Sequence, residues 1–120
     1  MVDRIALDKH ISDTYGVTAD HPWTNYPTHS VYRHKHNNKW FAIVMELSRD
    51  KVGLSGDGKI NIVNVKCDFM MIGNLLEQKG FFPAYHMNKS NWISVALDGS
   101  VDGDMIKLLL DISYDMTKKK

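Results

Sequence analysis

The sequence is poor in cysteine and proline and has no long apolar run. One cysteine among 120 residues excludes an internal disulfide and is typical of a protein kept in a reducing cytoplasm. No apolar stretch approaches the roughly 20 residues that a transmembrane helix needs, and charged residues are spread through residues 1–15. We therefore expect a cytoplasmic protein with no signal peptide and no membrane partner.

The sequence also lacks the fingerprints of common catalytic and nucleotide-binding sites. It contains no G-x-S-x-G, no P-loop and no G-x-G-x-x-G motif. Cys67 and His86 are the nucleophile–base pair that remains to be considered, but Cys67 occupies an inward strand position, where a thiol is most often a core residue. His34 and His36 lie two residues apart without the acidic or cysteine partner that would complete a zinc site. We therefore predict a non-catalytic protein with no metal site and no cofactor.

Charge is nearly balanced over the whole chain but unevenly distributed along it. The formal net charge is +1, which argues against a strongly basic nucleic-acid binder. Residues 29–66, however, carry seven lysines and arginines against three carboxylates, a local charge of +4, whereas residues 98–115 carry one lysine against five carboxylates, a local charge of −4. The positive block is compatible with a basic face, and equally with a solvated sheet surface balanced by acidic helices.

Hydrophobic periodicity predicts three helices, over residues 2–15, 68–79 and 100–117. Asp68 is a suitable N-cap for the second helix, and either Ser100 or Asp102 for the third. The third helix has too many apolar residues for a narrow stripe, so we expect it to be well buried. The inward positions expected in the first two helices are Ile5, Leu7, Ile11, Tyr15, Ile72, Leu75 and Leu76.

Alternating hydrophobicity predicts strands over residues 30–34, 40–47, 59–67 and 92–97. The first two form a hairpin around residues 35–39, where asparagine tolerates the positive φ of a tight turn. Along the second strand the pattern assigns Phe41, Ile43, Met45 and Leu47 to the core face and Trp40, Ala42, Val44 and Glu46 to the other. In the third strand it assigns Val63, Val65 and Cys67 inward and Asn64 and Lys66 outward.

This order of elements predicts an α+β two-layer sandwich, in which the helices pack on one face of a mainly antiparallel sheet. We expect a single domain over residues 1–117 and a monomer. Residues 118–120 are expected to form a disordered basic tail.

One stretch, residues 81–99, contains an unusual density of hydrogen-bonding and stacking groups. It begins after Gly80, where the second helix is expected to end, and continues into the last strand. The groups concerned are Tyr85, His86, Asn88, Lys89, Asn91 and Trp92.

Several motifs in and around this stretch resemble the MmcQ/YjbR family. They are residues 63–68 (VNVKCD), 83–89 (PAYHMNK), Trp92, 97–99 (LDG), the late Ser113-Tyr114 pair, and the early loop 20–23 (DHPW). The resemblance covers most of the chain, through about Asp115, in the same order and spacing. It implies a fold similar to the frataxin-like α+β sandwich. Family members are usually labelled DNA-binding, through two hairpin-like projections thought to form a double wing.

The resemblance therefore implies DNA as the leading partner. In that interpretation residues 35–39 form one wing and residues 86–92 the other. Arg33, Lys35, Lys39 and Lys89 contact phosphates, Asn88 and Asn91 reach base edges, Tyr85 or Trp92 stacks on a base, and Lys66 and His86 complete the surface.

The same residues leave two other interpretations open. Tyr85, His86, Asn88, Lys89 and Trp92, with Lys66, are also suited to line a cleft for a small anionic ligand or a protein partner such as a peptide carboxylate. In a purely structural role, Tyr85 and His86 bond to the backbone of an irregular segment while Trp92 packs in the core.

Overall fold

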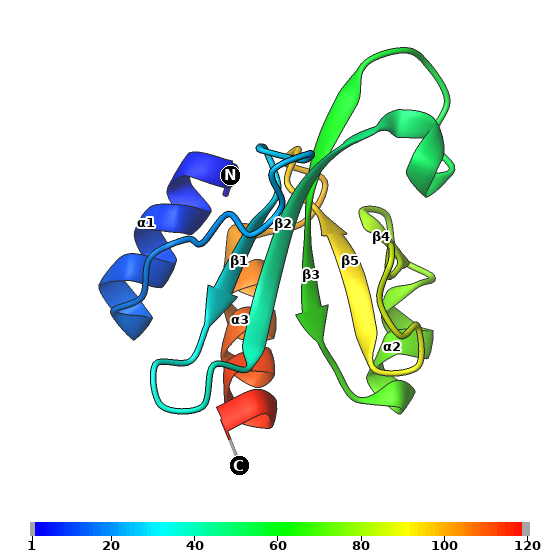
Figure 1. The fold of residues 1–120 in the computed structure, drawn as a ribbon. Coiled ribbons are helices and arrows are strands. Elements are labelled where there is room, and N and C mark those ends of the chain that lie inside the picture. The colour runs from blue at the N-terminus through cyan, green and yellow to red at the C-terminus, as the bar shows by residue number, and fades with distance from the viewer. Residues whose placement is uncertain (1, 119–120) are drawn as a thin grey trace.

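The computed structural model describes residues 2–118 and shows a five-stranded antiparallel sheet with helices on one face (Figure 1). The strand order is β1-β2-β3-β5-β4. In chain order the elements are α1 (Arg4–Tyr15), β1 (Ser30–Arg33), β2 (Trp40–Ser48), the 3₁₀ turn η1 (Arg49–Val52), β3 (Lys59–Lys66), α2 (Phe69–Leu75), β4 (Phe81–Pro83), β5 (Trp92–Ala96) and α3 (Gly103–Lys118). The predicted α+β sandwich is confirmed. Lys118 closes α3, and Lys119 and Lys120 of the expected tail lie outside the described residues.

Local signals define the first helix. The Asp3 carboxylate accepts a 2.9 Å hydrogen bond from the Ala6 amide at its start, and Gly16 ends it with φ of 69°. Leu7 and Ile11 are buried, but Ile5 is 82% exposed, so its predicted inward position is wrong. At 3.6 residues per turn, position 5 lies on the side of the helix opposite position 7.

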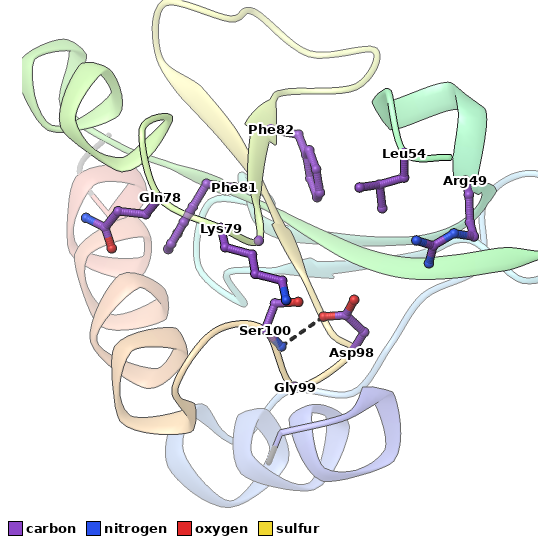
Figure 2. A pocket seen from close by; sticks show the side chains of 10 residues that line it. Arg49, Leu54, Gln78, Lys79, Phe81, Phe82, Asp98, Gly99 and Ser100 are labelled. Carbon is purple, nitrogen blue, oxygen red and sulfur yellow. Dashed lines mark hydrogen bonds between the residues drawn. The ribbon is translucent and has the colours of Figure 1, made fainter. Parts of the chain in front are cut away.

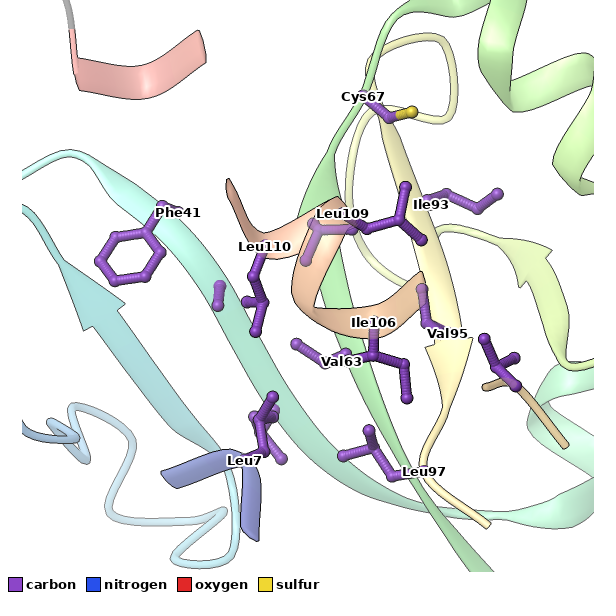
Figure 3. Packing of buried hydrophobic residues seen from close by; sticks show 14 of the residues in the cluster. Leu7, Phe41, Val63, Cys67, Ile93, Val95, Leu97, Ile106, Leu109 and Leu110 are labelled. Atoms are coloured by element: carbon purple, nitrogen blue, oxygen red, sulfur yellow. The ribbon is translucent and has the colours of Figure 1, made fainter. Parts of the chain in front are cut away.

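The helix-side core lies between α1, α3 and the sheet (Figure 3). Leu109 and Leu110 of α3 pack over strands β2, β3 and β5, and Leu7 of α1 extends the same layer. The third helix is less buried than predicted, since Leu108 is 50% exposed. The second helix is also shorter than predicted, because α2 ends at Leu75 and leaves Leu76 partly exposed.

A β-bulge changes which side chains of β2 face the helices. Tyr32 pairs with Ala42, but Arg33 pairs with Trp40, so Phe41 is the extra residue. Phe41 therefore joins Ala42 and the following even-numbered Val44 in the helix-side core. The predicted faces of this strand are wrong in that respect: Ile43, Met45 and Leu47 lie on the opposite face, and Ala42 and Val44 face the helices.

The opposite face of the sheet, called here the open face, is covered by loops instead of helices. Ile43 and Ile62 lie at the centre of its apolar cluster, under side chains from loop 20–29 and loop 84–91. Asn64, predicted to face outward, lies on this face but is fully buried. Val63, Val65 and Cys67 face the helices as predicted. The buried members of the open-face cluster are Val31, Ile43, Met45, Leu47, Ile60, Ile62 and Ala96.

Candidate functional site on the open face

A hollow of about 620 Å³ runs along β2 on the open face, and we call it the β2 hollow. Its apolar floor is formed by Ile43, Met45 and Leu47. One wall comes from loop 20–29 beside β1, and the other from loop 84–91, which follows the edge strand β4. The remaining lining residues are Trp23, Tyr26, His29, Trp40, Glu46, Ser48, Lys51, Lys59, Tyr85, His86 and Met87.

Aromatic contacts organise the wall on the β1 side. The Trp23 ring meets the Trp40 ring edge to face, with centroids 5.7 Å apart and an interplanar angle of 81°. Tyr26 and His29 are stacked, with centroids 5.1 Å apart and an angle of 9°. Such ring pairs give an irregular loop a defined position over the sheet.

The facing wall contains a second stacked pair, formed by Tyr85 and His86. Their ring centroids are 4.0 Å apart at an interplanar angle of 12°. His86 has a φ of 58°, in the left-handed region, which costs a non-glycine residue roughly 1–2 kcal/mol. The loop must hold this conformation against its intrinsic preference.

Two buried polar side chains hold that loop in place. The Tyr85 amide donates a 3.0 Å hydrogen bond to Ser94 Oγ, and the Tyr85 carbonyl accepts a 3.1 Å bond from Asn64 Nδ2. The Ser94 hydroxyl in turn donates to Asn64 Oδ1. Both backbone groups of Tyr85 are thereby fixed to the centre of the sheet, so the loop is anchored where it forms the wall of the β2 hollow.

The charged groups of the β2 hollow lie toward the end of β2. Lys51 is in η1, and Lys59 pairs across the sheet with Ser48, the last residue of β2. Lys59 Nζ lies 3.8 Å from Glu46 Oε1, at the outer limit of an ion pair. Burial lowers the pKa of His29 below its usual value, against a hydrogen bond with the Glu46 backbone that raises it. The walls of the hollow are thus aromatic. Its end near Ser48 carries one net positive charge, from Lys51 and Lys59 against Glu46.

A second hollow, of about 530 Å³, lies between η1, the start of β4 and the loop after β5 (Figure 2). Arg49, Lys79 and Asp98 bring charges of both signs into it. Two of its charged groups already serve the local backbone, since Arg49 Nε donates to the Ser55 carbonyl at 2.9 Å and Asp98 Oδ1 accepts from the Ser100 amide at 2.9 Å. The β2 hollow is therefore the stronger candidate site.

The chain is similar to known proteins over most of its length. The family model described as YjbR matches residues 12–116. The chain belongs to the YjbR family. It is 36% identical over 118 residues to the Bacillus subtilis (strain 168) protein YyaQ, covering 98% of this chain and 100% of that protein. The predicted family membership is thus confirmed.

Solved structures of similar proteins have the same fold. A Pseudomonas syringae protein, 34% identical, superposes with a TM-score of 0.94 for its crystal structure, covering 96% of this chain and 98% of that one. Its solution NMR structure gives 0.86, covering 96% and 92%. A Deinococcus radiodurans crystal structure, 21% identical, superposes with a TM-score of 0.75, covering 100% of this chain and 81% of that one, and shows the fold alone.

Two of the predicted site residues of this YjbR-family chain, Tyr85 and His86, line the β2 hollow. Arg33 adjoins it: its guanidinium carbon lies 6.0 Å from the centre of the Trp40 ring, and its Nη2 makes a 2.9 Å ion pair with Asp20. Lys66 lies at the end of β3, directly opposite Trp92 on β5. Neither Lys66 nor Trp92 is among the residues that line the hollow.

The remaining predicted residues lie in the two turns at the same end of the sheet (Figure 1). Lys35 and Lys39 are exposed in the β1–β2 turn, whose His36 Nε2 lies 2.8 Å from the Lys118 carbonyl at the end of α3. In loop 84–91, Asn88 uses its side-chain oxygen to accept a 2.9 Å bond from the Ser90 amide. The positions that complete this loop, Lys89 and Asn91, are exposed.

The positive block does not gather in one place. Arg33 is at one end of the β1–β2 hairpin, whereas Lys51 and Lys59 are at the far end of β2. A strand of nine residues spans roughly 30 Å at 3.3 Å per residue, so the two groups of cations are far apart.

Sequence reasoning missed several residues of the site. The sequence pattern assigns Trp40 only to a strand face and Asn64 to the outward face, and it gives His29, the first residue of the positive block 29–66, no role of its own. The available signal for Asn64 was a polar residue inside an otherwise Val/Ile strand. Cys67 and His86 cannot act as a catalytic pair, because Cys67 lies in the helix-side core and His86 lines the β2 hollow on the other face.

Within residues 2–118 no group of three or more His, Cys, Asp and Glu side chains is arranged to hold a metal ion. Burial raises the pKa of the Cys67 thiol, which disfavours the thiolate. Among the helices of the same residues, none has the length and hydropathy of a transmembrane span.

Proposed function

We propose that this protein is a non-catalytic binding protein that takes a small organic anion in the β2 hollow. The observation that carries the proposal is the hollow itself, with an apolar floor, aromatic walls and two lysines at one end. Its volume of about 620 Å³ lies within the range of ligand pockets, roughly 300–1,000 Å³. Apolar and aromatic surfaces supply affinity for the body of a ligand, and a few placed charges supply its orientation.

The anchoring of loop 84–91 supports the same proposal. Asn64 and Ser94 fix both backbone groups of Tyr85, so the wall is preformed before a ligand arrives. Preorganisation lowers the entropy cost of binding. The positive φ of His86 accompanies the stacking of its ring on Tyr85. The free-energy cost of this conformation is already met when the chain folds.

The test is a fragment screen that includes organic acids, amines and neutral compounds, followed by NMR. The three tryptophans provide the readout, because Trp23 and Trp40 line the β2 hollow and Trp92 does not. We expect organic acids to shift the indole N–H signals of Trp23 and Trp40 while that of Trp92 stays unchanged. Fragments that bind only at the hollow around Asp98, or that bind nowhere, would remove the β2 hollow as the working site.

DNA is a second candidate, favoured by the placement of cations at one end of the sheet. Arg33, Lys66 and the turn lysine Lys35 lie at that end, and Trp92 pairs with Lys66 across β3 and β5. Cations that neutralise phosphates release counterions, so affinity for DNA should fall steeply with salt. A titration of labelled duplex and single-stranded DNA at two salt concentrations measures this slope by fluorescence anisotropy.

Three variants test the DNA proposal. We expect Lys35→Ala and Lys89→Ala each to weaken binding uniformly across sequences and to reduce the salt slope by about one. Lys107→Ala, on α3 in the helix layer, should leave the slope unchanged. Absence of binding at low salt, or equal effects of all three variants, would contradict the DNA proposal.

A further inference from the structure

We infer that the ligand of the β2 hollow is a planar aromatic anion, whose ring lies between two tyrosine–histidine stacks and whose charged group points to Lys51 and Lys59. This inference rests on the proposed use of the hollow and adds the chemical class of the ligand and its direction.

Two stacked ring pairs form the walls of the β2 hollow. Tyr26–His29 and Tyr85–His86 are both nearly coplanar, with interplanar angles of 9° and 12°. They belong to loops on opposite sides of the β2–β3 floor, yet all four rings line one hollow. Flat aromatic walls on both sides favour a flat aromatic ligand, since ring pairs gain energy beyond the area that they bury.

The histidine of the first stack, His29, is an uncharged ring. Burial lowers the pKa of His29, so its imidazole is neutral at neutral pH; its N–H is engaged with the Glu46 backbone, and its other ring nitrogen is left as an acceptor. A neutral imidazole can stack on a ligand ring and hydrogen-bond to a ring substituent. A saturated chain offers it neither contact.

The stacked rings and the two lysines lie at different levels along β2. His29 precedes Ser30, which pairs with Val44, so the first stack lies near the middle of β2. Lys59 pairs with Ser48 at the end of β2. The separation is three to four residues, about 10–13 Å along the strand, and flexible lysine side chains shorten it. This span matches an aromatic ring system that bears an anionic group.

The net charge at the Lys51/Lys59 end of the β2 hollow favours a ligand with a single negative charge. The lining contains Lys51, Lys59 and Glu46, which together carry one net positive charge. The 3.8 Å contact between Lys59 and Glu46 is exposed and long, so a carboxylate from a ligand can compete for the ammonium group.

Three matched probes test the inference: naphthoate, which is aromatic and anionic; decanoate, which is anionic but saturated; and naphthamide, which is aromatic but neutral. Affinities come from calorimetry, and position comes from the indole N–H signals of Trp23 and Trp40, with Trp92 as the internal reference. We expect naphthoate to bind at least about tenfold more tightly than either of the other probes.

A double variant tests the direction of the ligand. Lys51→Met with Lys59→Met should weaken naphthoate by about tenfold and leave naphthamide unchanged. Lys35→Met with Lys107→Met, which removes two exposed cations outside the lining, should change neither affinity. Thermal unfolding verifies that each variant is folded.

The contrary results have different meanings. Decanoate binding as tightly as naphthoate would overturn the aromatic class, and an unchanged naphthoate affinity in the Lys51/Lys59 variant would overturn the direction. In both cases the β2 hollow would remain a binding site. If none of the probes shifts Trp23 or Trp40, this inference is wrong, and the fragment screen separately decides the proposed use of the hollow.

Discussion

The side-chain amide of Asn64 donates a 3.1 Å hydrogen bond to the carbonyl oxygen of Tyr85. Asn64 is a fully buried residue of β3, and Tyr85 forms part of the wall of the β2 hollow. A polar residue in the middle of the sheet thus determines where a loop lies. Its burial is tolerated because Ser94, also fully buried, donates to its oxygen.

Replacing Asn64 by leucine should destabilise the protein by about 1–3 kcal/mol, because the Tyr85 carbonyl and the Ser94 hydroxyl each lose a partner. Urea unfolding measures the free energy, and hydrogen exchange of residues 84–91 should rise. Asn25→Ala, at an exposed loop position, is the control and should be nearly neutral. If Asn64→Leu matched this control, the anchor would have no energetic role.

Ser113 is the second polar residue whose loss should be costly. Its hydroxyl donates to the Phe41 carbonyl at 2.6 Å and accepts from the Lys66 amide at 2.9 Å, which joins α3 to β2 and β3 at the bulge. Ser113→Ala leaves two backbone groups without this partner and should cost about 1–3 kcal/mol in the free energy of unfolding. The exposed Ser12→Ala on α1 should cost far less, and similar losses in the two variants would contradict the bridging role.

His34 should make the protein sensitive to mild acid. It is 1% exposed, its Nε2 lies 2.7 Å from Thr117 Oγ1, and burial lowers its pKa. Since Thr117 donates its own hydroxyl hydrogen to the Ser113 carbonyl at 2.7 Å, His34 Nε2 carries the proton and donates. Above the unfolded pKa of about 6.5 both states are neutral and the protein has its full stability. Below that pH the unfolded chain takes up a proton that the folded chain resists, so stability falls.

Chemical unfolding at about pH 8 and about pH 5 measures this loss. In His34→Gln, which retains a donor for Thr117 but does not titrate, the loss of stability between the two pH values should shrink. A loss as large as in the parent protein would assign the titration to another group, such as His29, whose pKa burial also lowers.

Gly80 should resist substitution for two separable reasons. Its φ is 92°, and an added Cβ would lie 2.5 Å from Val101 Cγ2 and 3.0 Å from Ser100 Cβ. Gly58 has a φ of 100° but nothing within 4 Å of its Cβ position, so Gly58→Ala measures the backbone cost alone. We expect Gly80→Ala to lower the free energy of unfolding by about 1–3 kcal/mol more than Gly58→Ala. Equal losses of unfolding free energy in the two variants would show that the Val101 side chain moves aside without an energetic cost.

The sequence predicted the fold well wherever local chemistry decides it. Asp68 caps α2, Asn38 takes the positive φ of the β1–β2 turn, and alternation correctly assigns Val63 and Val65 of β3 to the helix-side core. It failed for Ile43, Met45 and Leu47, which the pattern assigns to the face of Phe41, because a bulge inserts one residue between two regular stretches and periodicity contains no signal for that insertion. It failed at Asn64 because a buried amide and an exposed one look alike until the loop above is placed.

The candidate site was predicted only in part, for a related reason. Tyr85 and His86 stood out because polar and aromatic groups are dense around them. The facing wall, with Trp23 and His29, comes from a loop that is more than fifty residues earlier in the chain. Only the strand order β1-β2-β3-β5-β4 brings the two loops to opposite sides of one floor, and this order is a tertiary property.

The two edges of the sheet also determine how this protein can meet other chains. At β1, the Asp20 amide donates to the Val31 carbonyl at 2.9 Å and the Val31 amide donates to the Asp20 carbonyl at 2.8 Å, so loop 20–29 occupies part of that edge. At the other edge, β4 is three residues long and ends in Pro83, which has no amide hydrogen to donate. Neither edge is a long template for an incoming strand, which protects the protein from sheet-to-sheet aggregation. Association with another polypeptide must therefore rely on side chains, and mutations that free Val31 from Asp20 are the ones expected to promote fibrous self-assembly.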